Sequence, residues 1–324
     1  MNDLLSDLRQ WVRDLAGSPR PSPPAKALVF VHGIFSNHAT FETLVTGLLR
    51  ADPSLKAWGM YFFDYDFNQP ILASGLQLAQ ILRAAFPEAN SEITLVGHSM
   101  GGLVARTALL QEGDMGMVKR LVMLGTPNHG TLQTARMGVL AHMLRESTAV
   151  LWTVFAREAT GIKDLTQIGK TLDPLINSNC VERTRNVEYV TIPGLRFNEE
   201  AGWLESPQKT SAGLRALSVL FGIMKAIPGM NTELQLPHDG IVEERCVRLS
   251  GEPDHISERP ATGQGKTPFA PYLHIIHRDY KSVDHVTVQK ADRTIALLAE
   301  LLRSPDLEDW RTTLSRRGEF NLYP

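Results

Sequence analysis

Residues 93–102, Ile-Thr-Leu-Val-Gly-His-Ser-Met-Gly-Gly, are the stretch that decides the fold. Four mostly apolar residues come first and have the composition of a buried β-strand. Gly97, Ser99 and Gly101 then match Gly-x-Ser-x-Gly, and residues 100–111 continue as a helical pattern. A strand, a sharp turn and a helix in this order are what a nucleophile elbow requires, because the turn lifts the serine hydroxyl above the sheet edge. The stretch therefore predicts a reactive serine, Ser99, at the carboxyl end of a strand.

Compact apolar runs alternate with amphipathic helical patterns on both sides of this stretch. Continuous apolar strands that alternate with helices are typical of a mostly parallel central sheet with helices on both faces. The sequence therefore predicts an α/β fold. The predicted strands are residues 27–31, 58–63, 93–96, 121–124, 187–192 and 273–276, and the predicted helices begin near Thr40 and cover 72–86 and 100–111.

Composition excludes several classes of protein. The chain has 324 residues, of which 43% are hydrophobic and 21% charged, as in a globular protein with a sizeable core. Lys and Arg number 33 against 35 Asp and Glu, and the net charge of -2 argues against nucleic-acid binding. The two cysteines, Cys180 and Cys246, lack metal-ligand spacing. We expect two buried thiols, with one disulfide as the alternative for an exported protein.

The N-terminal residues form a separate unit. Residues 4–15 place apolar side chains on one helical face and charges of both signs on the other, so we expect packing against protein rather than lipid. Residues 18–24 are rich in proline and predict a short stiff linker. We therefore divide the chain into residues 1–24 and an α/β domain over 25–324.

Two long segments, residues 131–181 and 196–236, do not fit the alternation of strands and helices. Insertions of this length are usually functional, so we interpret them as helical caps or lids, with additional core helices as the alternative. No run of about 18 apolar residues and no leader peptide occurs. We expect no transmembrane segment and a cytoplasmic protein, with a peripheral position at a membrane as the alternative.

A serine hydroxyl needs a base to remove its proton and N–H donors to stabilise the oxyanion that follows. The first donor should be the backbone N–H of Met100, the residue after the nucleophile. The second should come from the loop after the first strand, where we select Ile34, with Phe35 as the alternative. His32 lies in the same loop, and we expect it to hold the loop by a structural hydrogen bond.

Three motifs in this order resemble the lipase and esterase branch of the α/β-hydrolases. They are Val31-His32-Gly33, the Gly-x-Ser-x-Gly stretch, and Gly-Thr-Pro-Asn-His-Gly at residues 125–130. The last motif is similar to one found in bacterial lipases and in inositol-deacylase-like hydrolases. The resemblance covers roughly residues 28–298 and implies the α/β-hydrolase fold.

The resemblance also implies a triad in the chain order serine, acid, histidine. Asp239 lies in an Asp-Gly-x-Val stretch similar to the one that carries the acid of such lipases, and His285 looks like their catalytic histidine. Asp239 would then orient the imidazole of His285 and stabilise its charged form. The competing acids are Asp173, Asp254 and Asp284, and the competing bases are His255, His274 and His277.

These residues predict hydrolysis of carboxylic esters, with a hydrophobic ester or a lipid as substrate. The alternatives are an acyltransferase, thioesterase or amidase that uses the same acyl-enzyme, and a non-catalytic interaction protein on the same scaffold. We expect no cofactor and no metal, since Thr287 and Gln289 follow His285 where calcium-binding relatives carry an aspartate. The sequence leaves the oligomeric state open.

Overall fold

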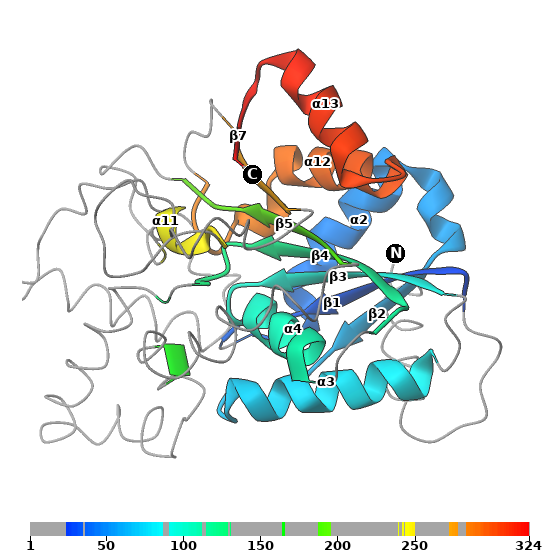
Figure 1. Cartoon of the computed structure of the whole chain (residues 1–324), viewed down its shortest axis with the longest axis vertical. Coiled ribbons are helices and arrows are strands. Elements are labelled where there is room, and N and C mark those ends of the chain that lie inside the picture. Colours follow the sequence, from blue (N-terminus) through cyan, green and yellow to red (C-terminus); the bar gives the residue numbers. More distant parts are fainter. Residues whose placement is uncertain are drawn as a thin grey trace, which may run out of the picture.

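The apolar runs of the sequence form one seven-stranded sheet in the computed structural model (Figure 1). The structure describes residues 24–34, 36–86, 91–111, 115–128, 130, 164–165, 187–195, 239, 242, 244–249, 272–277 and 283–323. The strand order is β2-β1-β3-β4-β5-β6-β7. The first six strands are parallel and correspond to the six predicted strands, and only β7 is antiparallel. The strands are β1 (Lys26–Val31), β2 (Gly59–Phe63), β3 (Glu92–His98), β4 (Val118–Leu124), β5 (Glu188–Ile192), β6 (Tyr272–His277) and β7 (Phe320–Tyr323).

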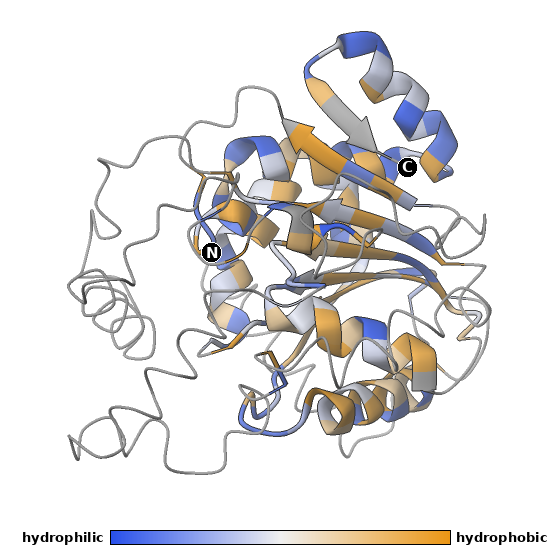
Figure 2. Cartoon of the chain, turned by 60° about the vertical axis from the view of Figure 1, so that its left-hand side comes forward, coloured by the Kyte–Doolittle hydropathy of each residue, from blue (hydrophilic) through white to orange (hydrophobic). Residues whose placement is uncertain are grey.

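Helices cover both faces of the sheet, as the alternating pattern predicts (Figure 1). Buried strands with side chains on two faces need an apolar layer on each, and the strands are largely hydrophobic along their length (Figure 2). One hydrophobic cluster joins α3 and α4 to one face, and a second joins α2, α12 and α13 to the other. The helices are α2 (Glu42–Ala51), α3 (Ile71–Ala85), α4 (Met100–Gln111), α11 (Glu244–Val247), α12 (Asp292–Arg303) and α13 (Leu307–Arg317), with short 3-10 turns η1 (His38–Phe41), η2 (Pro53–Ala57) and η5 (Val288–Lys290).

The C-terminal elements α13 and β7 were not among the predicted elements. The Asp306 side chain accepts a hydrogen bond from Asp309 N–H at 2.8 Å and caps the start of α13. Gly318, with a φ of 68°, ends the helix in the left-handed conformation that glycine adopts without strain. These two capping residues are a signal from which sequence reasoning could have found the helix. The four-residue β7 is too short for its residue pattern to indicate a strand, and its pairing with β6 defines it.

The terminal and inserted segments fall mainly outside the described residues. The N-terminal helix of residues 4–15, nearly all of the linker, the second insertion and most of the first are among them. From the first insertion, the Asp164 carboxylate accepts a hydrogen bond from Ile71 N–H at 2.9 Å, and Leu165 is buried in the cluster with α3 and α4. Cys246 is buried, whereas Cys180 lies outside the described residues. Among the helices that the structure describes, none has the length and apolar character needed to cross a membrane.

A buried ion pair fastens the C-terminal helices to the sheet. Arg120 on β4 donates to Glu188 on β5 at 2.6 Å and to the Leu301 carbonyl of α12 at 2.9 Å. The second oxygen of Glu188 accepts a hydrogen bond from Leu307 N–H, the first residue of α13, at 2.8 Å. Glu188 thus connects the central sheet to the start of the helix that precedes β7.

We predict that Arg120→Met lowers the free energy of unfolding by about 3 kcal/mol, because it leaves the largely buried Glu188 carboxylate without its cation. Urea denaturation followed by circular dichroism measures the change. Lys26→Met is the matched control, because the Lys26–Glu92 pair is about half exposed and should contribute less than about 1 kcal/mol. Equal losses in the two variants would contradict a structural role for the buried pair.

Candidate active site

The Gly-x-Ser-x-Gly stretch forms a sharp turn between β3 and α4, as predicted. Ser99 has a φ of 53°, and it is the only non-glycine residue with positive φ in the part of the chain that the structure describes. Its N–H donates to the Leu124 carbonyl of the adjacent strand at 2.9 Å, and its carbonyl accepts from Gly102 N–H at 3.1 Å. These two hydrogen bonds hold the strained residue at the point where the strand becomes a helix.

The turn is possible because small residues surround it. A Cβ at Gly97 would lie 2.5 Å from the Cα of Gly102, and one at Gly101 would collide with the backbone carbonyls of Val31 and His32. Strand β3, helix α4 and the loop after β1 therefore meet backbone to backbone. This close approach holds Ser99 against the loop that follows β1.

The structure brings Ser99, His285 and Asp239 together, although 186 residues separate the serine from the histidine. His285 Nε2 lies 2.8 Å from Ser99 Oγ, and His285 Nδ1 lies 2.8 Å from Asp239 Oδ2. All three residues are buried, Asp239 completely. A carboxylate can only accept, so Nδ1 carries the proton toward Asp239 and Nε2 is left as the acceptor for the serine hydroxyl. This is the geometry that a serine nucleophile and its base require.

The backbone and second oxygen of Asp239 fix the position of the acid. Its Oδ1 accepts from Val242 N–H at 2.7 Å, and its carbonyl accepts from His285 N–H at 3.0 Å. The competing acid Asp284 has a different role. Its Oδ1 accepts hydrogen bonds from the N–H groups of Val286 and Thr287, which shapes the turn that presents His285.

The competing base His274 belongs to a separate buried network. Its Nε2 lies 2.7 Å from Glu244 Oε1, and its Nδ1 lies 2.6 Å from Thr191 Oγ1. Arg248 donates to the same carboxylate, and these two partners bring the pKa of Glu244 down to about 2 although burial opposes them. The remaining competitors Asp173, Asp254, His255 and the His277 side chain lie outside the described residues.

Of the two residues selected as oxyanion donors, Met100 follows Ser99 directly and Ile34 follows Gly33, which lies beside Ser99. Met100 is the first residue of α4, so its N–H has no acceptor within the helix. A Cβ at Gly33 would lie 2.8 Å from the Cβ of Ser99, which puts the backbone just before Ile34 beside the serine. Phe35, the alternative donor, lies outside the described residues.

His32 holds the loop that carries Ile34, which confirms the structural role predicted for it. Its Nε2 accepts from Tyr65 N–H at 3.2 Å, and its carbonyl accepts from the Tyr65 hydroxyl at 2.9 Å. The two rings stack with centroids 4.5 Å apart. Because Nε2 accepts, the imidazole is neutral, and burial lowers its pKa further from 6.5. His32 thus ties the loop after β1 to the segment after β2.

His98, the residue before Ser99, contacts His285, and sequence reasoning did not identify this contact. Its Nε2 lies 2.7 Å from the backbone carbonyl of His285. Burial, followed by the proximity of His285, lowers its pKa from 6.5 to about 3, so the ring is neutral at physiological pH. The motif Gly-His-Ser would have singled it out, but its partner is a backbone group far along the chain.

Asn128, in the motif of residues 125–130, also makes contacts that the sequence could not specify. Its Oδ1 accepts from buried Arg106 on α4 at 2.8 Å, and its Nδ2 donates to the Val247 carbonyl of α11 at 2.6 Å. The motif thus links the helix after the nucleophile to the segment that follows the acid.

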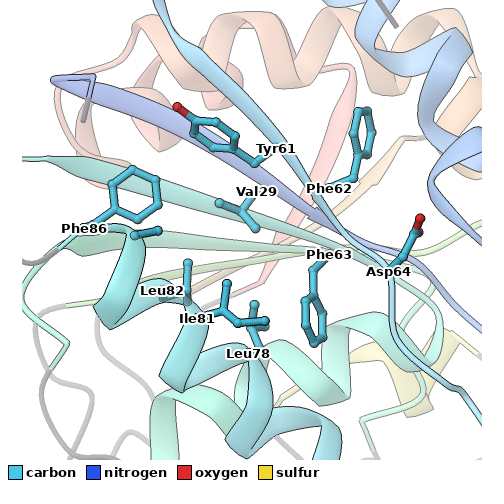
Figure 3. A pocket seen from close by; sticks show the side chains of 10 residues that line it. Val29, Tyr61, Phe62, Phe63, Asp64, Leu78, Ile81, Leu82 and Phe86 are labelled. Carbon is cyan, nitrogen blue, oxygen red and sulfur yellow. The ribbon is translucent and has the colours of Figure 1, made fainter. Parts of the chain in front are cut away.

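A cavity of about 140 Å³ lies away from this site, between β2 and α3 (Figure 3). Apolar side chains such as Leu78, Leu82 and Phe86 line it, and no member of the triad does. Among the residues placed by the structure, no group of three or more His, Cys, Asp or Glu side chains could hold a metal ion. The serine centre is therefore the candidate active site.

Comparisons with known proteins agree with this architecture. The sequence matches the family described as "Domain of unknown function (DUF7379)" over residues 6–195, more than half of the chain. The mature form of lipase BlEst2 from Bacillus licheniformis is similar in structure, with a TM-score of 0.55 at 19% identity over 88% of this chain and 94% of that chain. Phospholipase PlaB from Legionella pneumophila in complex with thio-NAD gives a TM-score of 0.59 at 12% identity over 90% of this chain and 61% of that chain. No curated protein sequence matches significantly.

These similarities show that the chain has the α/β-hydrolase fold that the sequence motifs implied. The family match includes the nucleophile elbow and stops before Asp239 and His285. The catalytic assignment of the acid and the base therefore depends on the geometry of this chain.

We predict that Ser99→Gly is more stable than Ser99→Ala by about 0.5–1 kcal/mol. Only glycine adopts the positive φ at this position without strain, although it also gains entropy in the unfolded chain. Urea unfolding midpoints of the two variants measure the difference. An alanine variant as stable as the glycine variant would contradict backbone strain at the elbow.

We also predict that stability falls as the pH drops below about 6.5. Burial lowers the pKa of His98 and of His274, so the native protein keeps both rings neutral while the unfolded chain binds protons. Between the native pKa and about 6.5 each histidine should lower the free energy of unfolding by about 1.4 kcal/mol per pH unit. Unfolding midpoints at pH 7.5, 6.0 and 5.0 measure this slope, which should be shallower in His98→Gln. A midpoint that does not change with pH would refute the prediction.

Proposed function

The chain belongs to the DUF7379 family, and from the serine centre that it carries we propose that it is a serine hydrolase that cleaves carboxylic esters. The single observation that carries the proposal is the continuous contact from Asp239 through His285 to Ser99, with 2.8 Å at each step. A buried serine with ordinary hydrogen bonding would need neither the strained backbone nor an imidazole held in one tautomer.

The reaction proceeds through an acyl-enzyme. Ser99 Oγ attacks the ester carbonyl carbon while His285 Nε2 takes the hydroxyl proton. The tetrahedral intermediate collapses, the bond to the alcohol oxygen breaks, and His285 returns the proton to the departing alkoxide. Water then attacks the acyl carbon with His285 again as the base, which releases the carboxylic acid and restores Ser99. Asp239 stabilises the imidazolium that forms in both steps.

The developing oxyanion requires two N–H donors beside Ser99, and we assign them to Met100 and Ile34. Met100 supplies a helix N-terminal N–H, where the partial positive charge of the helix favours an anion. Ile34 follows Gly33, whose backbone lies against the serine. Each such donor contributes about 3 kcal/mol of transition-state stabilisation in comparable enzymes.

We further propose that the substrate is a hydrophobic ester. Ile34 is a partly buried apolar residue that follows Gly33, whose backbone lies against Ser99. The similar solved structures bear the names lipase and phospholipase, which is consistent with an ester of this class. Substrate pockets of this kind are mostly apolar with a few oriented polar groups.

We predict that the protein hydrolyses p-nitrophenyl esters and that Ser99→Ala loses about four orders of magnitude or more in kcat. Asp239→Asn should also lose about 10⁴-fold, because it leaves His285 in the wrong tautomer. Hydrolysis rates across acyl chains of increasing length measure both losses and the preferred acyl length.

A fluorophosphonate probe provides an independent measurement, because it labels an activated serine without the need for the natural substrate. Asp284→Asn is the matched control for Asp239→Asn, because the amide oxygen can still accept the hydrogen bonds from Val286 and Thr287 N–H that shape the turn presenting His285. Per folded molecule, Asp284→Asn should retain most of the wild-type kcat. If the wild-type protein neither hydrolyses any ester nor reacts with the probe, the proposal is wrong and a non-catalytic role on this scaffold is favoured.

A further inference from the structure

His98 is buried between the nucleophile and the base, and the reaction scheme does not use it. It immediately precedes Ser99 in the chain, and its Nε2 lies 2.7 Å from the backbone carbonyl of His285. The imidazole rings of His98 and His285 have centroids 5.2 Å apart. A carbonyl can only accept, so Nε2 must carry the proton and donate it.

The rest of the His98 ring makes no polar contact that would explain its presence. Nδ1 is buried and has no hydrogen-bond partner among the residues that the structure describes. An unsatisfied buried acceptor costs about 1–3 kcal/mol, so an apolar ring would be the more stable choice if packing alone mattered. The donor at Nε2 is therefore the chemical feature of His98 that the surroundings use.

The backbone of His285 is held on both sides, by Asp239 of the triad and by His98, which precedes Ser99. Its N–H donates to the carbonyl of Asp239 at 3.0 Å, and its carbonyl accepts from His98, the neighbour of Ser99. The first bond fixes the base relative to the acid, and the second fixes it relative to the nucleophile. Neither bond involves the imidazole atoms that move the proton.

We propose that His98 is a positioning residue that fixes the distance between His285 and Ser99 through the His285 carbonyl. This inference rests on the proposed function. A base displaced by about 1 Å can lose about 100-fold in rate, so a bond that holds its backbone has a measurable catalytic effect. The His98 ring must also stay uncharged. His285 becomes a cation during the reaction, and a second buried cation with its ring centroid 5.2 Å away would oppose that charge.

Two substitutions that introduce a side-chain amide test the position of the hydrogen-bond donor. In His98→Gln the amide nitrogen occupies about the place of Nε2, whereas in His98→Asn it occupies about the place of Nδ1. We expect kcat of His98→Gln on a p-nitrophenyl ester to stay within about threefold of the wild type. We expect kcat of His98→Asn to fall by about 10- to 100-fold with KM within about threefold.

A stability-matched control separates positioning from loss of structure. Leu314→Ala removes a buried side chain on α13, which packs on the opposite face of the sheet from α4, and should lower stability by about 2–5 kcal/mol without a change in kcat of the folded enzyme. Urea unfolding of each variant gives the folded fraction. The rate of fluorophosphonate labelling should follow kcat in the His98 variants, because it reports the activated Ser99 directly.

The outcomes distinguish this inference from the proposed function. If the wild type is active and His98→Asn matches it, or if His98→Gln loses as much as His98→Asn while folded, the positioning role is wrong and the serine mechanism stands. If His98→Asn unfolds, His98→Phe, which keeps a ring and removes the donor, takes its place. A labelling rate and kcat well below those of His98→Gln then support positioning, and equal values show that His98 acts by packing alone. An inactive and unlabelled wild type would instead overturn the proposed function.

Discussion

The left-handed backbone of Ser99 is the constraint on which the candidate site depends. A residue with a side chain avoids this conformation, and Ser99 retains it because the strand before it and the helix after it are both anchored. The hydrogen bond from Ser99 N–H to Leu124 holds the turn to the neighbouring strand, and the absence of side chains at Gly97 and Gly101 lets the backbones approach. Replacing either glycine would separate α4 from β3 or from the loop after β1. The serine would then leave the position where it meets His285 and the proposed oxyanion donors.

The two buried histidines near the proposed triad, His32 and His98, are both neutral. His32 accepts a hydrogen bond at Nε2, and His98 is buried with a pKa of about 3. Only His285 has a carboxylate, Asp239, directly opposite its Nδ1 and a serine hydroxyl at its Nε2. In the proposed reaction, a positive charge in this region would therefore be stabilised at His285 and disfavoured at its neighbours. The fold separates one reactive imidazole from two structural ones by their partners rather than by their exposure.

Sequence reasoning identified the six parallel strands because buried strands are continuous apolar runs, and it identified α4 because a helical pattern follows the Gly-x-Ser-x-Gly motif directly. It did not find β7, since four residues are too few to indicate a strand and the strand exists only by pairing with β6. It could not assign a role to His98 or Asn128, because each contacts a backbone carbonyl far along the chain, which any residue could supply. The same reason left Asp284 as a competing acid until its hydrogen bonds to the turn after it were seen.

The sequence by itself determined the nucleophile elbow, because strand, glycines and helix are adjacent in the chain and their geometry is local. It also determined, for the same reason, most of the strands along the chain and the residue types of the site. Only the tertiary structure decided which carboxylate faces which histidine. Asp239 and His285 meet 46 residues apart, and His274 turns instead to Glu244. Contacts of this kind depend on the packing of distant segments around the sheet, and no local pattern of residues records that packing.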